Sequence, residues 1–422
     1  MTTNYSSKHN KKVCGDGKSC STCQLKYWCH STDEMKIELP KKEFTPLMET
    51  EYQLAIDIGT TTLAASLVAE GKVVATTGKI NPQVKWGADV LTRAEAATQH
   101  GRELQQVIHN TIAEISEVLC PPDVNVRSGV ITGNTTMLYL LTGRNPECLT
   151  KAPFEPDWLG DEEIEISGIK YYIPPCISAF VGADAVCATL STEMTEQNNT
   201  TLLTDIGTNG EILLWHKNKL YCASAAAGPA FEGFGLSHGM GASKGAVEHV
   251  INMGNKLTYK VIGDTEPEGL CGSGVIDLMA CLKQTGILEE NGTLTEPQML
   301  MDNKDINMIQ LAKSAICAGI LTVMDKAGVT TSQIAAFYIA GGFGKNLNIQ
   351  NAAAIGLYPF SLSGKINLTG NSALKGAVLL CGNSENKEKV RNICKKTETI
   401  KLTEEENFAK KFIECMAIRP II

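Results

Sequence analysis

The sequence predicts an α/β protein built from two similar halves, and three observations support this prediction. Apolar, strand-like runs alternate with helical patterns from Tyr52 onward. The segment AIDIGTTTLAA around Asp57 recurs 148 residues later (205 − 57) as LTDIGTNGEIL around Asp205. The chain has 422 residues, which is too many for one hydrophobic core. We therefore expect two halves on one plan, 51–198 and 199–422, which face each other across a cleft.

The individual elements follow from local patterns. Five apolar runs bounded by turn residues predict strands, in the order QLAIDIG, SGVITGN, TLLTDIG, GEILLWH and AAFYIAGG. A helix is predicted from Asp305 to Gly328, and this glycine stands where a C-cap is expected. Apolar residues recur at helical spacing within it, at Ile309, Ala312, Ile316, Ile320, Val323 and Ala327.

Composition excludes several classes of protein. Hydrophobic residues make up 43% and charged residues 20%, as in an ordinary globular protein. The net charge of −8 and the lack of a basic stripe argue against nucleic-acid binding. The polar first twelve residues do not resemble a signal peptide, and we expect no window to approach the ~18 apolar residues of a membrane span. We expect a cytoplasmic protein without membrane contact, whose 15 cysteines bind metal or are simply buried.

Both copies of the repeat deliver Asp-x-Gly-Thr from the end of an apolar strand into a tight turn. Gly59 and Gly207 can adopt the dihedral angles of the turn and let backbone N–H groups approach an anion. The two aspartates would hold Mg²⁺ through its water ligands. One copy alone would be read as an ordinary β-turn, but two copies in the same context favour a phosphate site. The expected nucleotide-binding residues there are Asp57, Gly59, Thr60, Thr61, Thr62, Gly207, Thr208, Asn209 and Gly210.

Three further segments are candidates for the same cleft. In IAGGFGKN, glycines after a strand would let a flat ring lie against the backbone, although this segment taken alone is better explained by a plain strand-to-helix turn. The candidates are Gly341, Gly342 and Gly344. In GLCGSG, Gly272 offers a similar backbone approach. Asp205 is the first candidate to position the attacking water. Asp184 in VGADA, 21 residues earlier (205 − 184), is the second, and helix capping explains it as well.

Four cysteines in the first thirty residues form a separate feature. Their spacing is Cys14-x5-Cys20-x2-Cys23-x5-Cys29, with small, turn-forming residues between them. Four thiolates suit an iron–sulfur cluster or Zn²⁺. We therefore expect a cysteine-rich module at 1–35, joined to the rest by a polar, proline-bearing linker at 36–50.

The motifs together resemble a known family. Three motifs occur in the order seen in the actin, sugar-kinase and Hsp70 (ASKHA) superfamily, whose halves are ribonuclease-H-like. They are the turn at Asp57 (phosphate motif one), the turn at Asp205 (phosphate motif two) and Gly341 with Gly342 (the glycine pair). Longer stretches are similar to reductive activators of corrinoid-dependent enzymes: NPQVKWGADVLTR, ITGNTTMLYLLTG, FVGADAVCATL, TDIGTNGEILL, ASAAAGPAFEG, GLCGSGVIDLMA and YIAGGFGKN. This resemblance covers the chain from about Tyr52 to the C-terminus. It implies a homodimeric ATPase that drives one electron onto a cobalt corrinoid, with Glu232 of GPAFEG in the nucleotide cleft.

The resemblance also bears on the cysteine module. CGDGKSCSTC is similar to the three-cysteine loop of plant-type ferredoxin domains, which such activators often carry. Cys29 follows too closely for that ~90-residue fold, so a [2Fe–2S] and a [4Fe–4S] cluster both stay open.

From these observations we expect ATP and Mg²⁺ in the cleft to control electron transfer from an iron–sulfur cluster. The electron would come from a low-potential donor and reduce a corrinoid protein from Co(II) to Co(I). Two alternatives stay open: a small-molecule kinase, or a regulatory ATPase with a structural zinc module.

Overall fold

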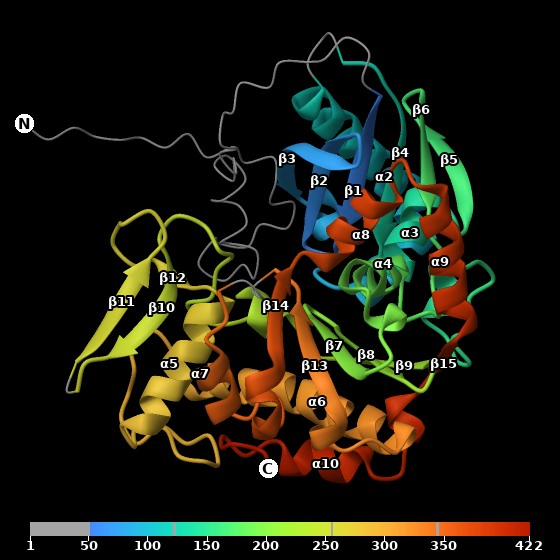
Figure 1. Cartoon of the computed structure of the whole chain (residues 1–422). Helices are drawn as coiled ribbons and strands as arrows, with labels where there is room; N and C mark the ends of the chain where they lie inside the picture. Colours follow the sequence, from blue (N-terminus) through green and yellow to red (C-terminus); the bar gives the residue numbers. More distant parts are fainter. Residues whose placement is uncertain (1–50, 121–123, 255, 343–345) are drawn as a thin grey trace, which may run out of the picture. The chain divides into compact units, whose positions relative to one another are not determined.

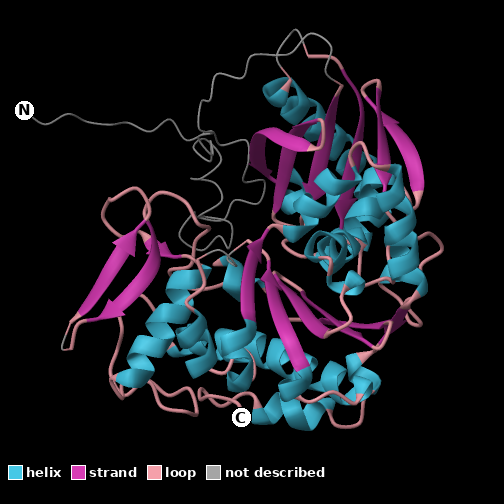
Figure 2. Cartoon of the chain, viewed as in Figure 1, coloured by secondary structure: helices cyan, strands magenta, loops and turns pink. Residues whose placement is uncertain are grey.

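The computed structural model describes residues 51–120, 124–254, 256–342 and 346–422 (Figures 1 and 2). The chain separates into two units, Met1–Lys36 and Ile37–Ile422, and all described residues belong to the second. The four N-terminal cysteines, the expected linker and Gly344 lie outside the described residues.

The first half is built on a six-stranded sheet of order β3-β2-β1-β4-β6-β5. β1, β2 and β3 form an antiparallel meander, and β4 and β6 add to it in parallel. The strands are β1 (Tyr52–Ile58), β2 (Thr62–Ala69), β3 (Lys72–Ile80), β4 (Val126–Gly133), β5 (Glu162–Ile166) and β6 (Ile169–Ile173).

The second half repeats this plan in a sheet of order β14-β13-β7-β8-β9-β15. β7, β8 and β9 form the meander, while β13 and β14 add in parallel. The strands are β7 (Thr200–Ile206), β8 (Gly210–His216), β9 (Lys219–Ala225), β13 (Ile334–Ala340), β14 (Ile366–Gly370) and β15 (Thr397–Thr399). The predicted fold class, with two halves on one plan, is confirmed, and all five predicted strands are present.

Helices cover both sheets, and a small third sheet is inserted into the second half (Figure 1). The helices are α2 (Val90–Leu119), α3 (Thr135–Thr142), α4 (Ala183–Thr192), α5 (Gly272–Gln284), α6 (Asn303–Ala327), α7 (Ile349–Ala354), α8 (Ser372–Leu380), α9 (Ser384–Lys395) and α10 (Phe408–Glu414). The small sheet contains β10 (Ala246–Asn252), β11 (Leu257–Val261) and β12 (Gly269–Leu270).

The predicted long helix is confirmed as α6, which begins after a capping box at Asp302 and ends at Gly328, where φ is 66°. In composition, α6 departs from our expectation that no window approaches a membrane span. α6 is long and apolar enough to pass that test, but 78% of its window is buried inside the protein. α6 is therefore a buried core helix that packs on the second sheet.

Three layers of apolar side chains hold the described residues together. α2 and α3 pack on the first sheet, and α5 and α6 pack on the second. Between the sheets lie α4, α8 and α9 (Figure 1). α8 follows β14 of the second half but packs against β1, β2 and β4 of the first. At the contact of α4 with α8, a Cβ on Gly376 would lie 2.1 Å from the carbonyl oxygen of Cys187, so only glycine permits this approach.

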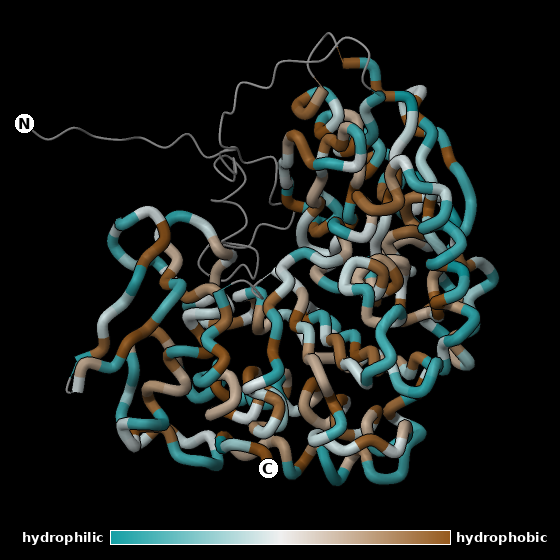
Figure 3. Tube along the Cα trace, in the orientation of Figure 1, coloured by the Kyte–Doolittle hydropathy of each residue, from teal (hydrophilic) through white to brown (hydrophobic). Residues whose placement is uncertain are grey.

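Figure 3 shows brown, hydrophobic segments within the packed layers and teal segments along the outer loops. Every cysteine that the structure describes is a free thiol, and most are buried.

Candidate functional site: a phosphate cleft between the two halves

The two phosphate motifs lie at equivalent places in the two halves. Asp57 is the next-to-last residue of β1, and Asp205 is the next-to-last residue of β7. A tight turn follows each strand: Gly59 N–H donates to the carbonyl of Thr62 at 2.9 Å, and Gly207 N–H donates to the carbonyl of Asn209 at 3.0 Å. The predicted strand-to-turn geometry is therefore present in both copies.

Two asparagines that the sequence analysis gave no role support the first loop. The Asn81 side-chain amide donates to the carbonyl of Gly59 at 2.8 Å. The Asn134 amide donates to the Thr60 hydroxyl at 3.1 Å, while its carbonyl oxygen caps α3. Both belong to motifs that resemble the activators, NPQVKWGADVLTR and ITGNTTMLYLLTG. Because both asparagines are far from the loop in sequence, the sequence analysis did not predict these hydrogen bonds.

Glu232 joins the two loops across the cleft. One carboxylate oxygen accepts from Thr208 N–H at 2.9 Å. The other accepts from the hydroxyls of Thr61 at 2.6 Å and Thr208 at 3.2 Å. These backbone and hydroxyl donors are of the kind that bind phosphate oxygens. The carboxylate of Glu232 therefore accepts from a set of donors suited to a phosphate group.

The segment that carries Glu232 has glycines at both ends. A short 3-10 turn, Pro229–Glu232, is flanked by Gly228 (φ 74°) and Gly233 (φ 83°). A Cβ on Gly233 would lie 2.1 Å from the carbonyl oxygen of Met240. Both conformations favour glycine, which explains why glycine stands at these two positions of the sequence.

Carboxylates gather behind the two loops. Burial is the largest cause that raises the pKa values of Asp57, Asp184, Asp205 and Glu211, and the negative charge of Asp184 raises those of the other three further. The pKa of Asp57 rises to about 7, that of Asp184 to about 6 and that of Asp205 to about 8. Burial also raises the pKa of Glu211 well above its usual range. When these groups are ionised, the cluster concentrates negative charge, which protons or a bound cation can offset.

Glu211 is a residue that the sequence analysis did not select. It ends the second copy of the repeat and is paired directly with Asp205 across β7 and β8. Asp184 lies in the first turn of α4, whose N-cap position is Gly182. Its carboxylate accepts from the Ala185 N–H at 2.8 Å, and its negative charge raises the pKa of Asp205. Both residues therefore belong to the cleft.

The carboxylate cluster suits Mg²⁺ held through water. The described residues contain no group of three or more His, Cys, Asp or Glu side chains that could hold a metal ion directly. Mg²⁺ keeps several of its own waters and takes only one or two carboxylates. Asp57 and Asp205, one from each half, therefore fit the group that the fold implies.

The glycine pair after β13 lies against the second phosphate motif. Gly341 has a φ of 102°, and a Cβ there would lie 2.5 Å from the carbonyl oxygen of Ile206 and 2.9 Å from a carboxylate oxygen of Asp205. Only glycine permits this approach. Gly342 is next to it, and Gly344 is outside the described residues. Gly272 begins α5, in the inserted part of the second half.

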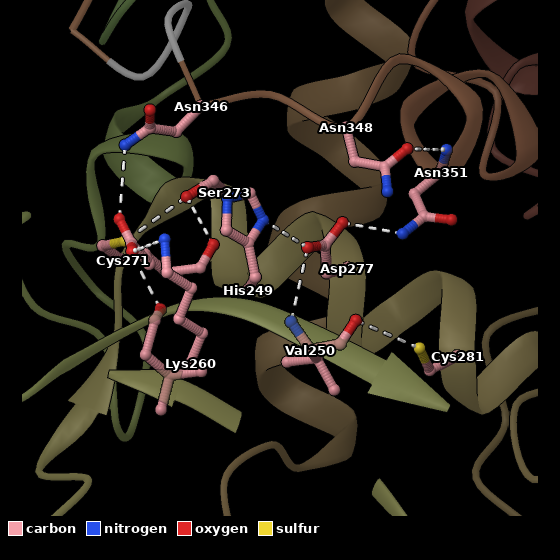
Figure 4. Close-up of polar contacts among 12 residues, drawn as sticks. His249, Val250, Lys260, Cys271, Ser273, Asp277, Cys281, Asn346, Asn348 and Asn351 are labelled. Carbon is pink, nitrogen blue, oxygen red and sulfur yellow. Dashed lines mark hydrogen bonds and ion pairs between the residues drawn. The ribbon is translucent and has the colours of Figure 1, made fainter. Parts of the chain in front are cut away.

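Polar contacts tie the segment after the glycine pair to this insert (Figure 4). Asn351 of α7 donates to the buried carboxylate of Asp277 in α5 at 2.7 Å, and His249 Nδ1 lies 2.9 Å from the same carboxylate. Asn346 donates to Glu248 of β10 at 3.4 Å. The glycine pair and the N-terminus of α5 are thus parts of one connected region.

Comparisons with known proteins agree with this architecture. Residues 52–197 match the family model of the RACo middle region. Residues 199–299 and 293–420 match the model of the C-terminal domain of RACo, the ASKHA domain.

Individual relatives are similar over most of their length. The corrinoid activation enzyme RamQ of Eubacterium limosum is 30% identical, over 88% of this chain and 71% of that protein. The [Co(II) methylated amine-specific corrinoid protein] reductase of Methanosarcina barkeri is 29% identical, over 76% and 68%. Among solved structures, a reductive activator for a corrinoid, iron–sulfur protein superposes with a TM-score of 0.80 at 32% identity, over 88% of this chain and 67% of that one. The middle region and the ASKHA domain account for nearly all described residues, and the chain belongs to the RACo family.

Proposed function

We propose that this protein is an ATP-dependent reductive activator of a corrinoid protein. The observation that carries the proposal is the pair of phosphate loops facing a buried carboxylate cluster, with both loops bridged by Glu232. The family membership and the names of the relatives supply the acceptor, a corrinoid protein reduced from Co(II) to Co(I).

In this proposal the cleft binds Mg·ATP through both halves. The N–H groups and the Thr60, Thr61, Thr62 and Thr208 hydroxyls bind the phosphate oxygens. Mg²⁺, when bound between Asp57 and Asp205, supplies the charge that offsets the cluster. A carboxylate with a pKa near neutrality can accept a proton from the attacking water at neutral pH. Asp205, with a pKa of about 8, and Asp184, with a pKa of about 6, are the candidates.

The electron path in this proposal begins in the cysteine module. Cys14, Cys20, Cys23 and Cys29 hold an iron–sulfur cluster, which a low-potential donor reduces. The onward transfer to Co(II) is uphill, and each ~59 mV of unfavourable potential is a tenfold loss in a one-electron step. Closure of the cleft around ATP is the source of free energy. The protein acts in the cytoplasm, as a homodimer.

The test compares full-length protein with residues 36–422. Both are mixed with a candidate Co(II) corrinoid protein, ATP and a low-potential donor, and the Co(II) to Co(I) absorbance change is followed. The full chain should reduce cobalt only with ATP. The truncated chain should hydrolyse ATP but reduce no cobalt. Equal cobalt reduction by the two chains would rule out the cysteine module as the electron path.

A further inference from the structure

Arg93 is a buried cation that the proposed function leaves unexplained. It lies in the first turn of α2 and ends the motif NPQVKWGADVLTR. Its side chain is completely buried, as are those of Asn81 and Gln83 from the same motif. A buried charge is costly unless an opposite charge and hydrogen bonds compensate it.

The described contacts of Arg93 do not include an acidic partner. Its Nε donates to the carbonyl of Gly87 at 2.8 Å, and its Nη1 lies 3.5 Å from the Met137 sulfur. Its Nη2 is buried and has no hydrogen-bond partner among the described atoms. Burial lowers the pKa of Arg93 to about 10, so the guanidinium is still protonated at pH 7. The structure therefore contains a buried, positively charged guanidinium whose Nη2 donor has no hydrogen-bond partner among the described atoms.

This guanidinium lies directly behind the first phosphate loop. The Asn81 amide donates to the carbonyl of Gly59 in that loop and also lies 3.7 Å from the Met137 sulfur. Arg93 contacts the same sulfur. The negative charges of Asp89 and, second, of Glu232 raise the pKa of Arg93, against the larger effect of burial. One of the two carboxylates that act on Arg93 is thus the one that bridges the two phosphate loops.

Among the described residues, no positive charge acts on the carboxylate cluster. The charged groups that shift the pKa values of Asp57, Asp205 and Glu211 are other carboxylates, and no charged group shifts that of Asp184. A triphosphate brings more negative charge than one Mg²⁺ can offset. Phosphoryl transfer also spreads charge over the terminal phosphate oxygens, which an arginine stabilises well.

We propose that Arg93 is the cation that recognises the terminal phosphate of the bound nucleoside triphosphate. This inference rests on the proposed nucleotide site. Glu232 accepts from the phosphate donors and is, with Asp89, one of the two acidic groups whose charges act on Arg93. When a triphosphate displaces Glu232, the terminal phosphate takes its donors and its place as an anion that acts on Arg93. A diphosphate ends one phosphate earlier and leaves Arg93 without its partner, so Arg93 makes the cleft distinguish ATP from ADP.

The competing explanation is a purely structural one. Gln83 also has a buried carbonyl oxygen without a partner, and a bridging water could join it to Arg93. Arg93 would then only brace the segment behind the first loop. A purely structural role would affect the affinities for ATP and ADP equally, whereas a contact with the terminal phosphate would affect the affinity for ATP alone. The two explanations therefore predict different ratios of ATP to ADP affinity.

The experiment uses the full chain with Arg93→Gln and Arg93→Lys, and Arg102→Gln as the matched control. Arg102 is on the same helix, exposed to solvent. Affinities for a non-hydrolysable ATP analogue and for ADP are measured with Mg²⁺ by titration calorimetry. Loss of a charged hydrogen bond should weaken the analogue about 10- to 100-fold in Arg93→Gln, with ADP nearly unchanged. Arg93→Lys should fall between, because lysine keeps the charge but loses the planar fork.

Several outcomes would overturn the proposal. Equal losses for the analogue and ADP would show a brace, and unchanged affinities would show no role. If Arg93→Gln does not fold, Arg93→Lys is decisive, since an unchanged analogue-to-ADP ratio there contradicts the proposal. Failure of wild-type and Arg102→Gln protein to bind any nucleotide would instead refute the nucleotide site itself. Binding by both with no selective effect at Arg93 would refute this inference alone.

Discussion

The side-chain amide of Asn371 donates a 2.8 Å hydrogen bond to the carboxylate of Asp57, although 314 residues separate them. The carbonyl oxygen of the same amide accepts from the Leu374 N–H at 2.7 Å and caps α8. The helix that crosses between the halves therefore begins at the carboxylate of the first phosphate motif. The hydrogen bond lowers the pKa of Asp57, against burial and Asp184, which raise it to about 7.

We expect Asn371→Ala to raise the pKa of Asp57 further, because the only described hydrogen bond that favours the ionised form is lost. ATP hydrolysis should then require a higher pH, so the ascending limb of the pH–rate profile should move up. The lost cap should also cost about 1 kcal/mol of stability. Asn348→Ala is the control, since Asn348 caps α7 in the same way. An identical pH profile in the two variants would contradict the prediction.

A second prediction concerns Asp205 and the stability of the nucleotide-free protein. The folded protein holds a proton on Asp205 up to about pH 8, whereas an unfolded chain releases it near pH 4. The folded state therefore binds more protons between these values, and stability falls as the pH rises through them. Asp205→Asn removes this effect. Without Mg²⁺ and nucleotide, it should be more stable than wild type at pH 8, by at least about 1 kcal/mol.

The measurement is denaturant unfolding at pH 5 and pH 8. The gain from Asp205→Asn should be larger at pH 8 than at pH 5, and ATP hydrolysis should be lost at both. Wild-type turnover in this variant would refute the assignment of Asp205 to catalysis. A variant less stable than wild type at pH 8 would show that burial does not penalise the ionised carboxylate.

A third prediction follows from the contacts of Glu232. Glu232→Ala frees the Thr208 N–H and the hydroxyls of Thr61 and Thr208, so an incoming phosphate group no longer has to displace a carboxylate. Inorganic phosphate and ADP should bind several-fold more tightly than to wild type, by calorimetry. Glu248→Ala is the control, because Glu248 is paired with Lys260 on the inserted sheet. Weaker binding in Glu232→Ala would mean that this carboxylate helps to hold the nucleotide.

The fourth prediction tests the cysteine module. A Cys20→Ser, Cys23→Ser double variant should lose the iron and sulfide that anaerobically purified protein contains, because both thiolates are expected ligands. ATP hydrolysis should persist, since the described cleft contains all the phosphate-loop residues. Cys120→Ser serves as the control, as a half-buried thiol at the end of α2. Unchanged iron in the double variant, or zinc in wild type, would favour the structural alternative.

Contiguous features of the site could be predicted from the sequence, and features assembled by the tertiary fold could not. The repeat around Asp57 and Asp205 indicated the paired halves and both phosphate turns. Asn371 and Asn134 have no such signal, because they reach the cleft from helix caps far away in the chain. Glu211 was within reach, since a strand that pairs with its neighbour through a tight turn places it opposite Asp205.

The sequence analysis overlooked the apolar composition of α6 for a related reason. The apolar content of α6 reflects contact with other parts of the protein on nearly every side, and composition alone does not say what surrounds a helix. Core burial and lipid exposure leave similar signatures in a sequence of this length.

The crossing of α8 has a consequence for how the chain is made. The face of the first sheet formed by β1 and β4 is covered by residues 372–380, which leave the ribosome only after the whole first half. Until then, a nascent chain that already contains the first half presents that apolar face uncovered. A fragment cut between the halves would keep the same bare face and should associate or aggregate on its own. The two halves are thus repeats in pattern but not separable modules, because α8 of the second half completes the first.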